Sequence, residues 1–369
     1  MFGSTPPREG TTEEKARISC AKFVARSRAL AIDGYIVYDI QDEKGRTELE
    51  RPFPFRKTLD PSWYASLFHD LSAKHCVVYK SVVENSMENL DMWLDAAIYT
   101  HGHRAVNLVG APSSKMQYKG PTISEAMLHV KKRNDVNFGC VSIPERHTTK
   151  GNEDMNMLRK VNKGAKWFIT QGIFDSGAVC KMLHDYGARC KEQGVVPKKV
   201  ILTFAPCGRP KTMTFIKWLG MNVPEAVYDR IMNAEASVAE SVAVAEELLV
   251  YILENTHGCD VPIGISVESL SIFKEEIDAA HTMFRNLQAI LLNSRGSPWS
   301  VKWYDVNSVI RSGSGGNNSP LPPNARKALK NGISPSPSPS TGSTDLITIV
   351  LAASLAGLLG GLLGRSLAK

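Results

Sequence analysis

Hydrophobic and polar positions follow two alternating patterns between residues 31 and 293. Short runs of β-branched and aromatic residues are followed by longer stretches in which apolar residues recur at helical spacing. This alternation predicts repeated βα units and a parallel sheet. Eight runs are predicted as strands: residues 34–40, 51–55, 76–82, 105–109, 137–143, 167–170, 200–204 and 261–267. Eight such units close on themselves, so the pattern predicts an α/β fold, a single (β/α)₈ TIM barrel.

The predicted barrel domain spans residues 31–310, and residues 1–30 are interpreted as an N-terminal extension. A doubly wound open sheet is the alternative architecture. That fold binds dinucleotides at a GxGxxG turn after its first strand, and the sequence has no such turn there. The strand count therefore favours the barrel.

The composition changes sharply after the predicted barrel. Residues 311–345 are rich in Ser, Pro and Gly, which is typical of a flexible linker. Residues 346–364 carry no charge and are long enough to cross a bilayer as a helix. We interpret them as a transmembrane tail anchor, with a terminal helix docked on the barrel as the alternative. An anchor so near the C-terminus predicts a barrel that faces the cytosol, held on the mitochondrial outer membrane, a peroxisome or the endoplasmic reticulum.

Within this apolar segment, Gly357 and Gly361 stand four residues apart. Such spacing allows two membrane helices to approach closely and predicts a homo-oligomer. Small residues that are merely tolerated in a span without a partner are an equally good interpretation.

Charge and cysteine content exclude some classes of protein. The net charge is +7, but Lys and Arg are interleaved with Asp and Glu along most of the chain, which does not indicate a nucleic-acid partner. The seven cysteines are scattered and form no CxxC pair, so the sequence predicts no metal site and indicates a reducing compartment.

Candidate chemistry lies at the predicted strand ends, because barrel enzymes place their active sites there. Asp39 ends the first predicted strand, Glu145 and His147 follow the fifth, and Gln171 ends the sixth. An amide at the inner end of a strand is costly without a partner, which favours Gln171 as a ligand contact. A surface carboxylate and a solvated loop histidine are the alternatives for Asp39 and His147.

Three polar residues share one face of the helix predicted between the fifth and sixth of the barrel's βα units. Asn156, Arg159 and Lys160 stand at positions i, i+3 and i+4. A solvated basic face is the common reason for such spacing. Arg and Lys also suit a diphosphate group, which they bind through charge-assisted hydrogen bonds.

Together these stretches resemble the methylenetetrahydrofolate reductase family. There a strand ending in Tyr-Pro-Glu-x-His leads into a helix with Asn-x-x-Arg-Lys, and the next strand ends in Thr-Gln, followed by Phe-Phe-Asp. This chain keeps the order and spacing at residues 143–147, 156–160 and 170–175. The resemblance implies a flavoprotein oxidoreductase of folate and one-carbon metabolism, in which NAD(P)H reduces FAD and the flavin reduces 5,10-methylenetetrahydrofolate to 5-methyltetrahydrofolate.

The resemblance also implies roles for individual residues. Asp39 would be the proton donor in place of a family glutamate, although its side chain is one methylene shorter. Gln171 would contact folate and nicotinamide. The residues implied for FAD binding are Glu145, His147, Asn156, Arg159 and Lys160.

Two strands depart from the family pattern. The family's Leu-Arg-Gly-Asp after the fourth strand is replaced by Leu-Val-Gly-Ala at residues 108–111, which removes an acidic group beside the flavin. At the last strand Glu268 is a carboxylate with no assigned role. Two alternatives therefore stay open: a flavin-free folate reductase that uses direct hydride transfer, and a non-catalytic membrane-anchored binding or scaffold barrel.

Overall fold

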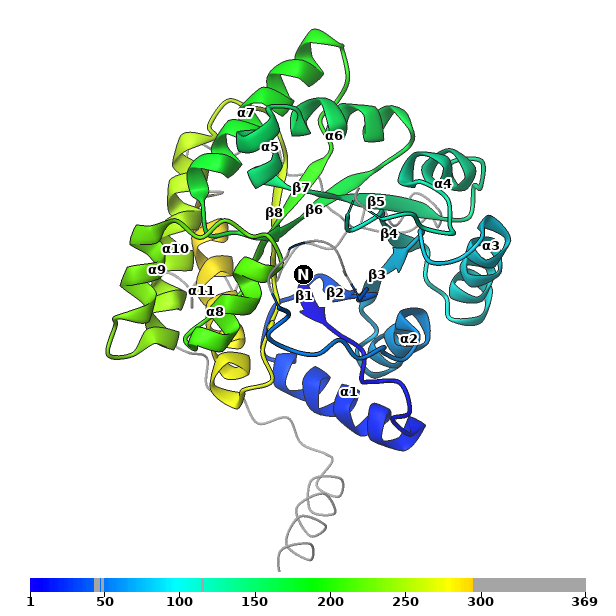
Figure 1. Cartoon of the computed structure of the whole chain (residues 1–369), viewed down its shortest axis with the longest axis horizontal. Helices are drawn as coiled ribbons and strands as arrows, with labels where there is room; N and C mark the ends of the chain where they lie inside the picture. Colours follow the sequence, from blue (N-terminus) through cyan, green and yellow to red (C-terminus); the bar gives the residue numbers. More distant parts are fainter. Residues whose placement is uncertain (43–46, 48–49, 114–115, 295–369) are drawn as a thin grey trace, which may run out of the picture. The chain divides into compact units, whose positions relative to one another are not determined.

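Eight parallel strands form a closed barrel in chain order (Figure 1). The computed structural model describes residues 1–42, 47, 50–113 and 116–294. Within this part of the chain the predicted TIM barrel is confirmed. The strands are β1 (Phe2–Ser4), β2 (Gly34–Val37), β3 (His75–Ser81), β4 (Ala105–Val109), β5 (Asn137–Ser142), β6 (Trp167–Gly172), β7 (Lys199–Phe204) and β8 (Ile263–Val267).

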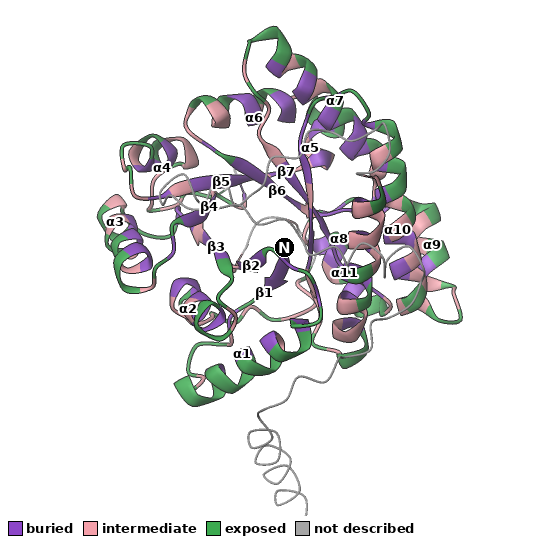
Figure 2. Ribbon diagram, turned by 180° about the vertical axis from the view of Figure 1, so that it is seen from behind, coloured by how far each residue is buried: buried purple, intermediate pink, exposed green. Residues whose placement is uncertain are grey.

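Helices surround the barrel, and most bury one face toward the strands or a neighbouring helix while their outward faces are exposed (Figure 2). Their starts follow local chemistry: the capping box of Thr122 and Glu125, for example, begins α4. The helices are α1 (Glu13–Ser27), α2 (Pro61–Ser72), α3 (Met87–Asp95), the π-helical turn η1 (Ala96–Thr100), α4 (Ile123–Val130), α5 (Pro144–Lys150), α6 (Glu153–Asn162), α7 (Ser176–Glu192), α8 (Pro210–Trp218), α9 (Glu225–Met232), α10 (Ser237–Asn255) and α11 (Lys274–Ser294).

The first strand lies where the sequence predicted an extension, so the boundary at residue 30 is wrong. Strand β1 pairs in parallel with β2 through Phe2 and Tyr35 and with β8 through Phe2 and Val267, which closes the barrel. The periodicity missed it because β1 has only three residues, one of them Gly3.

Residues 51–55 were predicted as a strand and do not form one. Their sequence, Arg-Pro-Phe-Pro-Phe, contains two prolines, which cannot donate to a sheet ladder. The strand count of eight was therefore reached with one wrong strand and one missed strand.

The interior of the barrel is filled with apolar side chains near the amino ends of the strands. Met1, Ile36, Val77, Trp167 and Ile201 belong to this buried cluster. Such packing fills the amino end of the barrel, so a ligand site is expected at the carboxyl ends of the strands.

The linker at residues 311–345, the tail anchor at residues 346–364 and the end of the predicted barrel domain, residues 295–310, lie outside the described residues. No helix in the described part of the chain is long and apolar enough to cross a membrane. All seven cysteines are free and buried.

Candidate functional site

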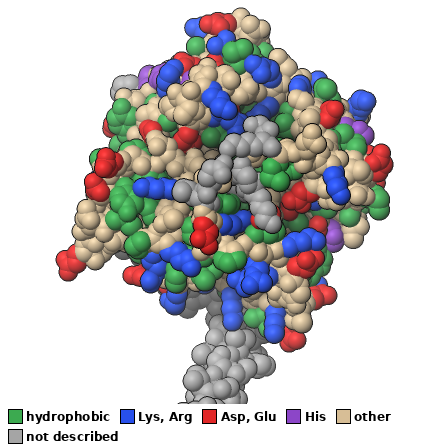
Figure 3. Space-filling view, in the orientation of Figure 1, with side chains coloured by type: hydrophobic (Ala, Val, Ile, Leu, Met, Phe, Trp, Pro, Cys, Tyr) green, Lys and Arg blue, Asp and Glu red, His purple; other side chains and the backbone are tan. Residues whose placement is uncertain are grey.

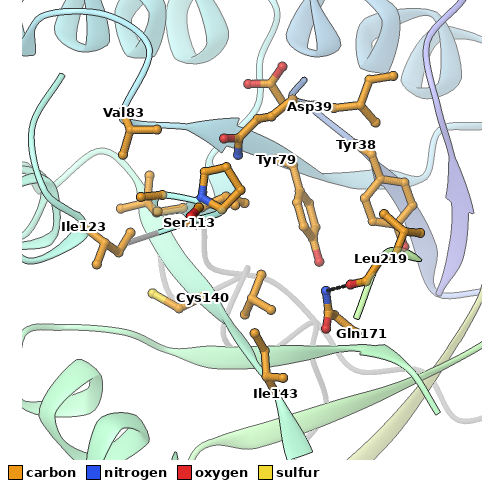
Figure 4. Close-up of a pocket in the computed structure, with 18 of the residues that line it drawn as sticks. Tyr38, Asp39, Tyr79, Val83, Ser113, Ile123, Cys140, Ile143, Gln171 and Leu219 are labelled. Atoms are coloured by element: carbon orange, nitrogen blue, oxygen red, sulfur yellow. Dashed lines mark hydrogen bonds between the residues drawn. The ribbon is translucent and has the colours of Figure 1, made fainter. Parts of the chain in front are cut away.

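A cavity of about 870 Å³ opens at the carboxyl ends of the barrel strands (Figure 4). Its volume falls within the range of about 300–1,000 Å³ typical of small-molecule sites. Most of the area of its wall is apolar, and polar side chains from several strand ends lie within it. They include Tyr38 and Asp39 after β2, Arg51, Tyr79 on β3, Arg146 on α5, Lys160 on α6, Gln171 on β6 and Glu268 after β8.

Asp39 is a paired carboxylate. Its Oδ2 accepts a hydrogen bond of 2.9 Å from the backbone N–H of Ser81 and lies 3.7 Å from Nζ of Lys80. Burial raises the pKa of Asp39, whereas the Lys80 ammonium and the Ser81 N–H oppose that rise. The structure thus places the predicted proton donor in the cavity, but beside a cation that favours its charged form.

Glu268 is the second carboxyl of the cavity, and it follows directly after β8. Burial raises its pKa from the ordinary value of 4.5 to about 7, and the neighbouring Tyr38 hydroxyl offsets only part of this effect. Within the described part of the chain, Glu268 takes part in no ion pair. It therefore holds a proton far more readily near neutral pH than an ordinary glutamate does.

A glycine on β1 makes the room that Glu268 and Tyr38 occupy. A Cβ atom at Gly3 would lie 2.8 Å from Cε2 of Tyr38 and 2.9 Å from Cβ of Glu268. Both distances are shorter than any ordinary contact, so either side chain would have to move. The missing side chain of β1 thus allows β2 and β8 to supply the polar groups at this point of the barrel.

Gln171 is held at one end of its amide only. Its Nε2 donates to the carbonyl of Leu219 at 3.5 Å, whereas its Oε1 is buried and accepts no hydrogen bond from the described residues. Figure 4 shows the rings of Tyr38 and Tyr79 projecting into the cavity toward Gln171. The two rings pack edge to face, with centroids 4.8 Å apart. A ligand with an N–H group would satisfy the free acceptor.

Of the five residues that the sequence assigned to a cofactor, Lys160 alone is among the described residues that line the cavity. Its Nζ donates to the carbonyl of Val141 at 2.7 Å and lies 3.6 Å from Oε1 of Glu153. The ammonium is thus already held by protein groups.

Asn156 and Arg159 lie on α6 away from the cavity lining. The amide of Asn156 donates to Glu153 Oε2 at 3.2 Å and accepts from the exposed Arg159 guanidinium at 3.2 Å. The i, i+3 spacing of Asn156 and Arg159 on α6 thus brings their side chains into contact with each other.

His147 is buried between α5, α6 and α7. Its Nε2 lies 2.8 Å from Oδ2 of Asp185, and its Nδ1 lies 3.6 Å from Oδ1 of Asp154. Glu145, at the start of α5, is half-buried and does not line the cavity, whereas its neighbour Arg146 does. The structure therefore brings Asp39, Gln171 and Lys160 to one cavity and places the other four predicted residues elsewhere.

Sequence reasoning missed Tyr38, Tyr79 and Arg51. Arg51 lines the cavity and stacks on aromatic rings, with its guanidinium carbon 4.8 Å from the centre of Trp218 and 5.7 Å from that of Phe215. The interleaved Arg and Phe residues at 51–55 are the sequence signal for this contact, although the same residues predict a strand.

The space-filling view shows Lys and Arg side chains scattered among Asp and Glu over the face seen in Figure 1 (Figure 3). The described side chains of this face therefore do not gather into one basic patch.

Comparison with known proteins agrees with the predicted resemblance. Residues 81–259 match the model of the family described as methylenetetrahydrofolate reductase. A similar solved structure is described as an uncharacterized protein from Clostridium thermocellum that binds two copies of 5-methyl-5,6,7,8-tetrahydrofolic acid. The two chains share 28% identity with a TM-score of 0.66, over 78% of this chain and 94% of the other. No curated protein sequence matches this chain.

Proposed function

Because residues 81–259 match the methylenetetrahydrofolate reductase family, we propose that the barrel of this chain binds a reduced folate. We propose further that it reduces 5,10-methylenetetrahydrofolate to 5-methyltetrahydrofolate with NAD(P)H. The observation that carries the proposal is the unsatisfied Oε1 of Gln171, which faces an aromatic cavity at the catalytic end of the barrel. The folate-binding structure from Clostridium thermocellum supports the same class of ligand.

The cavity offers each part of a folate a suitable surface. The pterin ring carries amide and amine N–H groups, from which Gln171 Oε1 would accept a hydrogen bond. Tyr38 and Tyr79 would pack against its flat face. The carboxylates of the glutamate tail need cations, and Arg51 and Arg146 line the same cavity.

The residues present do not form a flavin cradle of the kind the resemblance implies. Lys160 lines the cavity, but its ammonium is held by the Val141 carbonyl, and Asn156 and Arg159 lie outside the lining. Strand β4 ends in Val109, followed by Gly110 and Ala111, so it brings no charged group to tune a flavin. We therefore propose direct hydride transfer from the reduced nicotinamide to the folate, and we derive no step through FAD.

The test is a reductase assay on the full-length protein in detergent, with NADH or NADPH, methylenetetrahydrofolate, and either no flavin or added FAD. Formation of 5-methyltetrahydrofolate without flavin, by a protein whose visible spectrum shows no flavin bands, supports direct transfer. Released FAD together with FAD-dependent turnover would replace it with the flavin-mediated route. Binding of 5-methyltetrahydrofolate without turnover under either condition would indicate a barrel that binds folate but does not reduce it.

We also propose that residues 346–364 anchor the protein to a membrane, with the barrel in the cytosol. The uncharged length of this segment supports the proposal. Alkaline extraction of cell membranes tests it: the full chain should stay in the membrane pellet, and a chain ending at residue 311 should be released. Release of the full chain would contradict the anchor.

Crosslinking of the same two proteins tests the proposed homo-oligomer, because equal dimer content in both would remove a role for Gly357 and Gly361.

A further inference from the structure

Two carboxyl groups of the described residues, Asp39 and Glu268, line the cavity, and the proposed reduction needs one proton donor. We propose that Glu268, rather than Asp39, is the general acid that protonates the folate. This inference rests on the proposed function, since it names the group that would donate the proton in that reaction.

The neighbours of the two carboxyls differ. Asp39 accepts the Ser81 N–H and lies 3.7 Å from the Lys80 ammonium, and both contacts stabilise a carboxylate. Glu268 faces no cation of the described chain. Burial beside phenol rings disfavours its charged form, and a pKa of about 7 suits an acid that must both give and regain a proton near neutrality.

The described groups that act on Glu268 and Tyr38 are hydroxyls, and the buried Met1 ammonium, whose pKa burial lowers to about 6, donates instead to the Ile265 carbonyl of β8. Strand β1 contributes Gly3, which has no side chain, and the Ser266 hydroxyl of β8 acts on the neighbouring Tyr38. Tyr38 after β2 and Tyr79 on β3 are phenols whose pKa values are raised well above 10, by burial first and then by the charge of Glu268. Both phenols are therefore neutral across the range in which Glu268 titrates, and the Met1 amine, which titrates in a similar range, is not a carboxyl and is told apart from Glu268 by infrared spectroscopy.

Glu268 also has access to the ligand. It lines the cavity together with Tyr38 and Tyr79, on which the pterin is proposed to pack. The absence of a side chain at Gly3 is what permits this position, because a Cβ atom there would meet Cβ of Glu268 at 2.9 Å. A carboxyl group after β8 thus occupies space that a longer residue on β1 would fill.

The Glu268 carboxyl gives its proton to the anilinic nitrogen of the five-membered ring. The bond between that nitrogen and the methylene carbon breaks, and its electron pair stays on the nitrogen. The methylene carbon becomes the iminium carbon of the pterin-side nitrogen. Hydride from NAD(P)H, with both electrons, reduces this carbon to a methyl group. NAD(P)⁺ leaves, and the Glu268 carboxylate takes a proton from water.

The first experiment is an infrared titration of the full-length protein without substrate, which separates protonated carboxyls from carboxylates. Four proteins are compared: wild type, Glu268→Gln, Asp39→Asn and, as a control, Glu254→Gln, whose side chain is exposed on α10. We expect a carboxyl that loses its proton near neutral pH in every protein except Glu268→Gln. Persistence of this transition in Glu268→Gln, or its loss in Asp39→Asn, would overturn the proposal.

The second experiment measures turnover and folate binding on the same proteins. Glu268→Gln should lower kcat by about 100-fold or more, the usual contribution of a general acid, while 5-methyltetrahydrofolate still binds. Glu268→Asp, which keeps an acid, should recover part of the lost rate and retain a falling pH profile. An unchanged kcat in Glu268→Gln would overturn the proposal, and lost binding with an altered circular dichroism spectrum would assign Glu268 to structure instead.

Failure of the proposed function has a different result. A wild-type protein that binds folate and forms no product would remove the reductase activity, and with it the catalytic role of Glu268. The infrared titration would still decide whether Glu268 holds the proton of this cavity, because it needs neither turnover nor ligand.

Discussion

Carboxyl groups in two regions of this barrel have opposite surroundings. Between α5, α6 and α7, the carboxylates of Glu153 and Asp154 are almost completely buried, and each is surrounded by cationic partners or hydrogen-bond donors. At the mouth of the barrel, Glu268 is in contact with phenol rings and has no cation beside it among the described residues.

The difference shows which buried acids serve structure and which are free for chemistry. Glu153 lies 3.6 Å from Lys160 and 3.5 Å from Arg146, so its charge is compensated within the protein. A carboxyl without such compensation responds to burial by holding its proton. The helix cluster thus fixes α5 and α6 against β5, whereas the mouth keeps a proton available.

The largest expected effect on stability comes from breaking the paired region. Glu153→Ala leaves Lys160 and Arg146 without their anion and removes the acceptor for the Ile143 N–H, so the free energy of unfolding should fall by about 3–5 kcal/mol. Urea denaturation measures this change. Glu192→Ala, an exposed glutamate at the end of α7, is the control and should have little effect. A loss no larger than that of the control would show that the cluster does not compensate its charges as described.

The second effect concerns the pH dependence of stability at the mouth. Because the pKa of Glu268 is raised from 4.5 to about 7 on folding, its favourable contribution is complete below pH 4.5 and is lost as the pH rises through 7. The loss is on the order of 3 kcal/mol. Denaturation curves measured across this interval should show the decline in wild type and in Glu254→Gln, and a flatter profile in Glu268→Gln. Parallel profiles for all three proteins would argue against a protonated Glu268.

The third effect tests the space on β1. Gly3→Ala forces a Cβ atom against Tyr38 and Glu268, and overpacking of this kind costs about 1–3 kcal/mol. Thermal unfolding measures the cost, and kcat should fall with it because Glu268 is displaced. Gly264→Ala on β8 is a matched control, since its nearest contact would be an ordinary 3.5 Å to Ile201. Equal melting temperatures for the two variants would mean that the floor of the cavity adapts without strain.

The smallest effect concerns the amide at the mouth. Gln171→Ala removes one neutral hydrogen bond to the folate, so the dissociation constant of 5-methyltetrahydrofolate should rise by about three- to tenfold. Calorimetric titration measures it, and Gln193→Ala, exposed after α7, is the control. Unchanged affinity in Gln171→Ala would remove this residue from the proposed pterin site.

The sequence by itself determined the barrel and several positions at its mouth. Alternating β-branched runs and amphipathic helices are local patterns, and in a barrel any residue at the carboxyl end of a strand faces the same opening. That rule was enough to bring Asp39 and Gln171 to one cavity. It was also enough to identify Glu268 as a carboxylate without a role.

Only the tertiary structure decided how these groups are used. The family resemblance implied that His147 binds a cofactor, but packing of α5 against α7 directs its ring to Asp185. Strand β1 was not predicted, because three residues that include Gly3 are too few to show an alternation of apolar and polar positions. In the sequence, Glu268 and Asp39 are both carboxylates at strand ends. Their tendency to hold a proton differs because Lys80 lies beside Asp39, whereas Tyr38 lies beside Glu268. Charge compensation depends on distances between residues remote in sequence, which local patterns do not encode.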